Sequence, residues 1–192
     1  DGESIESMLA LEAEFPQNCF AMMGLHPSHV QPETYEKELD LVEDWLGRRS
    51  WAGVGETGID LYWDKTTLAI QQIAFARQIE WAKELKLPVI IHSRESNEEC
   101  LELVKAGQDG RLRGIFHCFS GTVEQAQRMI DLGFWLGIGG TLTYPKSELP
   151  EVLREIPLEH IVLETDAPYL PPVPYRGKRN ESSYLINIAD KL

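Results

Sequence analysis

The chain has 192 residues, and its 31 acidic and 18 basic side chains give a formal net charge of −13. This surplus of negative charge argues against a broad electrostatic grip on nucleic acid. The longest apolar runs, such as 87–91, are far shorter than the roughly 20 residues of a membrane helix, so no membrane role is predicted. Three cysteines without CxxC spacing indicate reduced thiols, and we expect one cytoplasmic domain over residues 1–192.

Helical and strand-like segments alternate along the chain. A helical pattern at 4–14 comes first, and short apolar segments typical of buried parallel strands follow at 20–25, 51–55, 88–91, 114–116, 134–138 and 160–163. Ser96 and Thr122 can cap two helices, and a last helix is expected over 184–192. Helical periodicity is clearest over 66–85, where the predicted apolar face consists of Leu68, Ile73, Phe75, Ala76, Ile79, Ala82 and Leu85.

This alternation predicts an α/β fold, either a (β/α) barrel or a doubly wound sheet with a nucleotide site. Neither a G-x-G-x-x-G turn after a first strand nor a P-loop occurs, so the TIM-type (β/α) barrel is preferred. Six strands are too few for the eight of such a barrel. We therefore expect the first one or two βα units to be missing from this chain, together with a smaller part of the C-terminus.

Side chains that can bind metal follow four of the predicted strands. They are Glu56, His92, His117 and Asp166. Because the carboxyl ends of barrel strands meet at one mouth, these residues can converge although they are far apart in sequence. Two imidazoles and two carboxylates suit Zn²⁺ or Mn²⁺, and carboxylates with water also accept Mg²⁺. The pattern predicts a hydrolytic metal site, whereas His160 precedes its strand and is expected to have no catalytic role.

Five segments stand out along the chain: GLHP at 24–27, GETGID at 55–60, IHSR at 91–94, HCFSG at 117–121 and ETDAPY at 164–169. Together they resemble the TatD family of metal-dependent deoxyribonucleases. The resemblance runs from about residue 20 to 180 and includes DLYWD at 60–64. It implies an amidohydrolase-like barrel with two divalent ions, Glu56 bridging them, His92 and His117 on one ion, and Asp166 on the other.

The sequence departs from the family pattern in two places. The family's first strand carries a His-x-His pair followed by Asp, and no such motif occurs here; His26 and His29 do not replace it. In the segment RNES at 179–182, the family usually has Pro after the glutamate.

The resemblance implies that metal-activated water hydrolyses phosphodiester bonds in DNA, with Asp166 and Glu56 as catalytic residues. Substrate contacts are expected from residues near the same mouth, namely His26, Arg94, Tyr169, Arg179 and Asn180. The few basic residues favour contacts with a short stretch of a single strand or strand end. This favours exonuclease over endonuclease action. Two alternatives stay open: a metal-dependent hydrolase of another ester or amide, and a truncated barrel without catalysis. No obligate protein partner is predicted.

Overall fold

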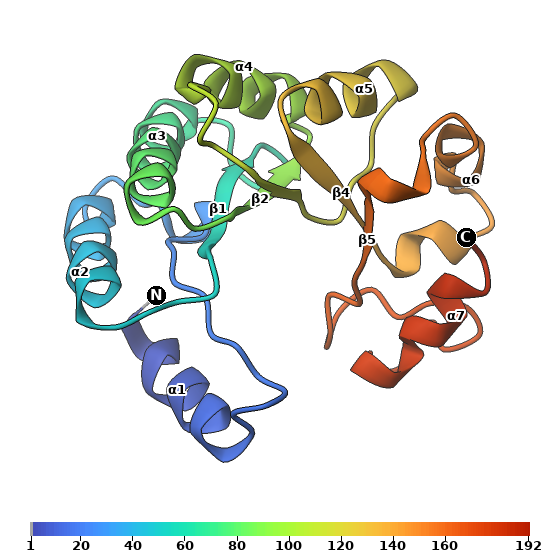
Figure 1. Cartoon of the computed structure of the whole chain (residues 1–192), viewed down its shortest axis with the longest axis horizontal. Helices are drawn as coiled ribbons and strands as arrows, with labels where there is room; N and C mark the ends of the chain where they lie inside the picture. The colour runs from blue at the N-terminus through green and yellow to red at the C-terminus, as the bar shows by residue number, and fades with distance from the viewer. Residues whose placement is uncertain (1) are drawn as a thin grey trace. The chain divides into compact units, whose positions relative to one another are not determined.

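The computed structural model describes residues 2–192, apart from the side chain of residue 3, as two compact units (Figure 1). The first unit is Asp1–Gly114 and the second is Ile115–Leu192. Parallel strands alternate with helices in both, which confirms the predicted α/β class. The single domain over residues 1–192 stays a prediction.

The first unit is built on two parallel strands, β1 (Val54–Asp60) and β2 (Val89–Arg94). Gly58 lies opposite His92 and Asp60 lies opposite Arg94 in their register. Helix α3 (Leu68–Leu85) packs against β1, and its Phe75 and Ile79 are fully buried. The other elements are η1 (Gly2–Ser4), α1 (Ile5–Glu14), η2 (Pro27–His29), α2 (Tyr35–Arg48), α4 (Asn97–Gly107) and β3 (Gly114–Phe116), which begins at the last residue of this unit.

The second unit has β4 (Phe134–Ile138) paired in parallel with β5 (Ile161–Leu163). Thr122 caps helix α5 (Val123–Asp131) as predicted, and it does so through a capping box in which its hydroxyl accepts the Gln125 N–H. The other elements are η3 (Gly140–Thr143), α6 (Leu149–Leu153), η4 (Leu158–His160), η5 (Ser182–Tyr184) and α7 (Leu185–Ala189). Alternating strands and helices therefore continue through this half of the chain.

Several predicted elements differ from the observed ones. Segment 20–25 forms a single parallel bridge, between Met23 and Val54, rather than a full strand. Strand β1 begins later than predicted and continues to Asp60, because a GETGID sequence without an apolar run still pairs with β2. Ser96 precedes α4 as predicted, but its hydroxyl donates to the Ile59 carbonyl instead of capping the helix. The helix expected over 184–192 ends at Ala189.

The predicted apolar face of α3 is wrong at three positions, because Ile73 and Leu85 are 54% and 43% exposed and Ala76 is exposed as well. Two buried glutamines, Gln71 and Gln78, lie on the inner face instead. They are seven residues apart, so they share one side of the helix two turns apart. The amide of Gln78 accepts the Leu25 N–H at 2.7 Å and donates to the Leu25 carbonyl at 3.2 Å. The backbone N–H and carbonyl of Leu25 are thereby both satisfied.

Gln71 makes the same pair of contacts with Asp60, the last residue of β1. Its side chain accepts the Asp60 N–H at 2.8 Å and donates to the Asp60 carbonyl at 3.1 Å. One face of α3 thus fixes the backbone just before His26 and at the end of β1.

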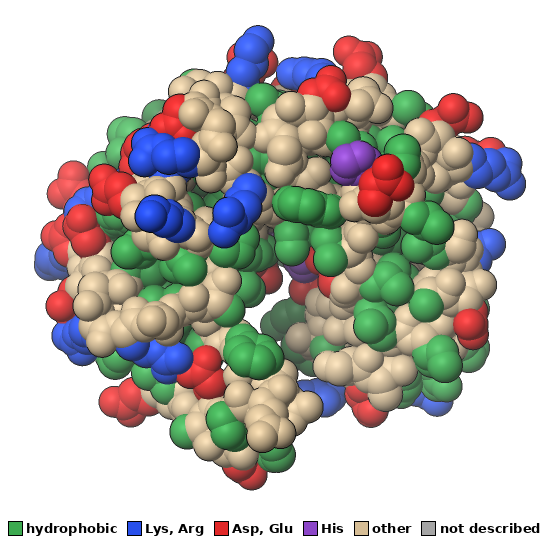
Figure 2. Space-filling model, in the orientation of Figure 1, with side chains coloured by type: hydrophobic (Ala, Val, Ile, Leu, Met, Phe, Trp, Pro, Cys, Tyr) green, Lys and Arg blue, Asp and Glu red, His purple; other side chains and the backbone are tan. Residues whose placement is uncertain are grey.

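Charged side chains of both signs lie next to one another on the face drawn in Figure 2. On the helices of the first unit, for example, Arg77 of α3 contacts Asp40 and Glu43 of α2 at 3.1 and 2.6 Å. Within residues 2–192, none of the helices combines the length and the apolar character that a bilayer crossing requires.

Replacing Gln78 by Met should lower the free energy of unfolding by about 2–4 kcal/mol, because Met fills similar space but leaves the Leu25 N–H and carbonyl buried without a partner. Urea denaturation followed by circular dichroism measures this. The control is Gln72→Met, half-buried on the same helix, which should change stability by less than about 0.5 kcal/mol. Equal effects of the two variants would show that the Gln78 contacts carry no special stability.

Candidate metal centre

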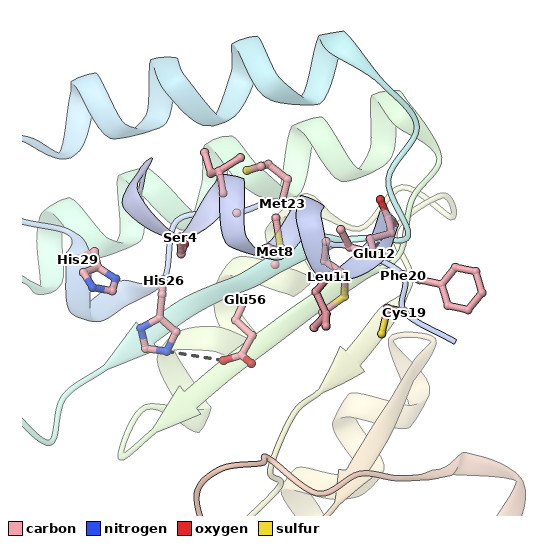
Figure 3. A pocket seen from close by; sticks show the side chains of 15 residues that line it. Ser4, Met8, Leu11, Glu12, Cys19, Phe20, Met23, His26, His29 and Glu56 are labelled. Atoms are coloured by element: carbon pink, nitrogen blue, oxygen red, sulfur yellow. Dashed lines mark hydrogen bonds and ion pairs between the residues drawn. The ribbon is translucent and has the colours of Figure 1, made fainter. Parts of the chain in front are cut away.

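Three side chains of the first unit converge: His26, Glu56 and His92. His26 precedes η2. Glu56 and His92 were predicted to follow the ends of two strands, but they lie inside β1 and β2. The His26 Nε2 atom lies 3.7 Å from the Glu56 Oε2 atom (Figure 3). The same nitrogen lies 3.2 Å from His92 Nδ1.

These spacings suit a divalent cation. A tetrahedral zinc ion with bonds of about 2.0–2.1 Å holds its ligand atoms about 3.3 Å apart. One ligand atom from each of the three residues can be chosen so that all lie within 4.8 Å of one another. Two nitrogens and a carboxylate oxygen are also ligands that zinc and manganese accept. The three residues therefore fit a metal ion.

A cavity of about 450 Å³ opens beside His26 and Glu56. Its other walls come from α1 and from segment 19–24, and they are largely apolar, with Met8, Leu11 and Met23 among them (Figure 3). The polar group thus lies at one end of an apolar cavity, an arrangement typical of ligand sites.

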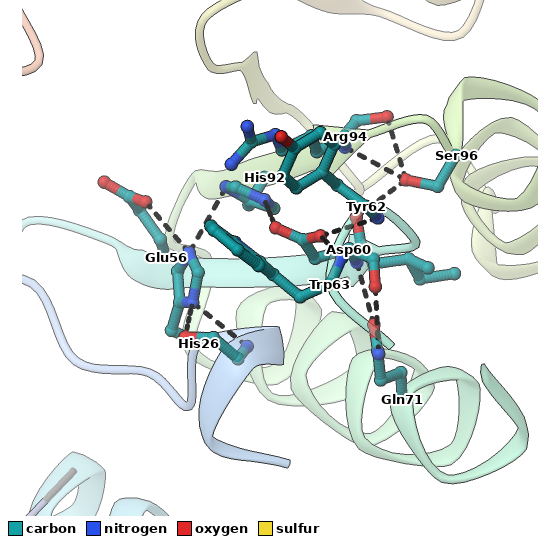
Figure 4. A network of polar contacts seen from close by, with 12 residues as sticks. His26, Glu56, Asp60, Tyr62, Trp63, Gln71, His92, Arg94 and Ser96 are labelled. Atoms are coloured by element: carbon teal, nitrogen blue, oxygen red, sulfur yellow. Dashed lines mark hydrogen bonds and ion pairs between the residues drawn. The ribbon is translucent and has the colours of Figure 1, made fainter. Parts of the chain in front are cut away.

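A buried carboxylate orients the His92 ring. Asp60 is 4% exposed, and its Oδ2 atom lies 3.0 Å from His92 Nε2 (Figure 4). An ionised carboxylate only accepts hydrogen bonds, so this contact keeps a proton on Nε2 and leaves Nδ1 for a metal. Gly58, opposite His92, allows the strands to approach closely, since a Cβ there would lie 2.0 Å from the His92 carbonyl oxygen.

The second unit holds a similar arrangement around His117, the residue after β3. The His117 Nδ1 atom lies 2.9 Å from Oε2 of Glu164, whose Oε1 accepts the Cys118 N–H at 2.7 Å. The other ring nitrogen, Nε2, lies 3.6 Å from Oδ1 of Asp166. Gly137 makes room for this pair, because a Cβ there would lie 2.3 Å from Glu164 Oε2. This histidine is therefore also held by one carboxylate and directed at another.

Asp166 lies three residues beyond β5 with a φ of +56°, a conformation that Asp tolerates better than most residues. Its loop is held by Asn180, which is fully buried and donates from Nδ2 to the Thr165 and Tyr169 carbonyls. Asn180 therefore positions this loop, and its predicted contact with substrate stays a prediction.

The other predicted substrate residues lie as follows. His26 belongs to the candidate metal group, whereas Arg94 and Arg179 are exposed and Tyr169 is 69% exposed. Sequence reasoning missed Asp60 and Glu164 as site residues, although both belong to recognised motifs. Their position at or just after the end of a buried strand, close in sequence to a predicted ligand, is the signal that could have identified them.

Replacing Asp60 by Asn should weaken binding of Zn²⁺ or Mn²⁺ by about 10- to 100-fold. In this variant the amide oxygen would take the Oδ1 position, because that position accepts the Tyr62 N–H at 2.9 Å. The new amide nitrogen would therefore face His92 Nε2. His92 would then carry its proton on Nδ1, the nitrogen needed by the metal. Isothermal titration calorimetry measures the affinity.

The control for this experiment is Asp64→Asn, which removes the same charge from an exposed carboxylate of the same turn that accepts hydrogen bonds from Thr66. It should bind metal as the unchanged protein does. Equal affinities for the Asp60 and Asp64 variants would refute the orienting role of Asp60.

The comparisons with known proteins agree with this geometry. YabD of Bacillus subtilis, described as an uncharacterized metal-dependent hydrolase, is 37% identical over 174 residues, which are 90% of this chain and 68% of that protein. YcfH of Escherichia coli, described in the same words, is 35% identical over 171 residues, 87% of this chain and 62% of that protein. The chain therefore spans about two thirds of the length of these relatives.

The crystal structure of YjjV, a TatD homolog from Escherichia coli K12, matches with a TM-score of 0.90 and 34% identity over 98% of this chain and 73% of that one. The family model described as TatD related DNase matches residues 1–192. The chain therefore belongs to the TatD related DNase family of metal-dependent hydrolases.

Proposed function

We propose that this protein hydrolyses phosphodiester bonds in DNA, acting on single strands or strand ends, with two divalent ions as cofactors. One observation carries the hydrolytic part: in each unit a carboxylate holds one nitrogen of a histidine, and the other nitrogen faces a further potential ligand. The DNA substrate is supported by the family's description and by the resemblance of the five motifs. A TIM-type (β/α) barrel is part of the same proposal.

The proposed ligands are Glu56 and His92 from the first unit and His117 and Asp166 from the second. Divalent ions, when bound, lower the pKa of water and neutralise charge on the attacking and leaving oxygens of phosphate. His26 is within reach of the same ligand atoms in the first unit, so it can hold either a cation or a phosphate oxygen.

Asp166 is the proposed general base, which orients the attacking water and accepts its proton. Its side chain is 26% exposed, so water can reach it, and the Nε2 atom of His117 lies near one of its oxygens. Exposed Arg94 and Arg179 can donate to phosphate oxygens, and Tyr169 can stack on a base. The net charge of −13 suits such a local contact set better than a long grip on duplex DNA.

Chelation with EDTA should abolish cleavage of single-stranded DNA, and Mg²⁺, Mn²⁺ or Zn²⁺ should restore it. Cleavage of a labelled oligonucleotide, compared with a panel of aryl esters, lactones and aminoacyl esters, measures this. Faster turnover of any ester in the panel than of DNA would contradict the proposed substrate, and cleavage that resists EDTA would contradict the cofactor.

Asp166→Asn should lower turnover by about 10²- to 10⁴-fold, the usual contribution of a general base, with little change in the unfolding transition. The control is Asp190→Asn, an exposed carboxylate just beyond α7 in the same unit, which should retain activity. Near-normal turnover of the Asp166 variant would rule out its role as the base.

A further inference from the structure

Two large aromatic side chains are exposed just beyond the end of β1. Trp63 is 73% exposed and Tyr62 is 49% exposed. Their rings meet edge to face, with centroids 4.8 Å apart and planes at 89°. Large apolar side chains are usually buried, so two adjacent exposed rings mark a surface that can bind a ligand.

The guanidinium of Arg94 lies over these rings. Its central carbon is 3.8 Å from the Tyr62 ring centroid and 5.6 Å from that of Trp63. Among the side chains that the structure describes, none forms an ion pair or hydrogen bond with this guanidinium. Stacking leaves the N–H groups at its edge directed outward, where they can bind a phosphate in a forked contact.

The acidic side chains nearest in sequence have other partners. Asp64 accepts the N–H and hydroxyl of Thr66, and Glu95 pairs with Lys65 at 3.6 Å. The positive charge of Arg94 is therefore not neutralised by its neighbours along the chain.

The same carboxylate that orients His92 holds the aromatic pair. Asp60 Oδ1 accepts the backbone N–H groups of Tyr62 and Trp63 at 2.9 and 3.4 Å, while Oδ2 contacts His92. Arg94 follows His92 by two residues on β2 and lies opposite Asp60. Figure 4 shows the two rings, Arg94 and His92 gathered at this end of the strands. The rings are thus fixed relative to a candidate metal ligand.

We propose that Tyr62, Trp63 and Arg94 bind one nucleotide of a single-stranded nucleic acid, with an unpaired base stacked on Trp63 and a phosphate held by Arg94. This assignment rests on the proposed function, because the nucleotide site would hold the substrate strand next to the hydrolytic site. Every base has a π-face, so the site accepts any base but requires that it be unpaired. It selects strands with free bases over small phosphodiesters, and it needs no broad basic surface.

Binding without turnover tests the site directly. Fluorescence anisotropy in EDTA gives the Kd of a labelled ten-nucleotide oligothymidylate for the unchanged protein and its variants. Trp63→Ala should raise Kd by about 5- to 100-fold, as expected for the loss of one stacked base, and Trp63→Phe should recover much of this loss. Trp135→Leu is the control, because Trp135 is also 40% exposed but no guanidinium lies over its ring among the described residues.

An oligonucleotide of the same length without bases provides a second measurement that needs no variant. The unchanged protein should bind it as weakly as Trp63→Ala binds the normal strand, and Trp63→Ala should bind both strands alike. Equal binding of the two strands by the unchanged protein, equal effects of the Trp63 and Trp135 variants, or no binding of the normal strand would each overturn the site.

Metal-dependent cleavage of the same oligonucleotide is measured in parallel. Base-dependent binding without cleavage would refute the proposed function and keep the site. If the protein cleaves the strand but its Kd changes neither when the bases are removed nor when Trp63 is replaced, the function is kept and the site is refuted.

Discussion

A histidine binds a metal through the ring nitrogen that lacks a proton, so the group that holds the proton on the other nitrogen decides how the ring can act. Asp60 is the group that faces this second nitrogen in His92, and Glu164 is the group that faces it in His117. In each unit a glycine leaves room beside this contact, because a Cβ at Gly58 would meet the His92 carbonyl oxygen and a Cβ at Gly137 would meet Glu164 Oε2. The metal chemistry assigned to this chain depends on these two contacts.

The orienting carboxylates are themselves held by backbone groups. Asp60 accepts the N–H groups of the following turn with its side chain. The backbone N–H and carbonyl of Asp60 are in turn hydrogen-bonded by the Gln71 side chain of α3. Glu164 accepts the Cys118 N–H with the oxygen that does not face His117. Helix α3 therefore contributes both to the core, through Phe75, and to the position of Asp60, which contacts the candidate ligand His92.

Sequence patterns predicted the alternating elements well because buried parallel strands are apolar runs, as at β3 and β4, whose bounds agree with the prediction. The end of β1 was missed because it pairs through a Gly-rich stretch. Partners distant in sequence were also missed: the contact of Gln78 with Leu25 joins residues 53 positions apart, and no periodicity encodes it. The candidate ligands were predicted from their motifs, whereas the contacts of Asp60, Glu164 and Asn180 could be found only in the packed structure.

Anomalous X-ray diffraction from crystals of the protein grown with Mn²⁺ or Zn²⁺ tests the assignment of the histidine nitrogens most directly. We expect an anomalous peak about 2.0–2.2 Å from His92 Nδ1 and another ion, or the same one, at that distance from His117 Nε2, with Asp60 and Glu164 still on the opposite ring nitrogens. Peaks that touch neither nitrogen, or rings turned so that Nε2 of His92 and Nδ1 of His117 bind the metal, would contradict it.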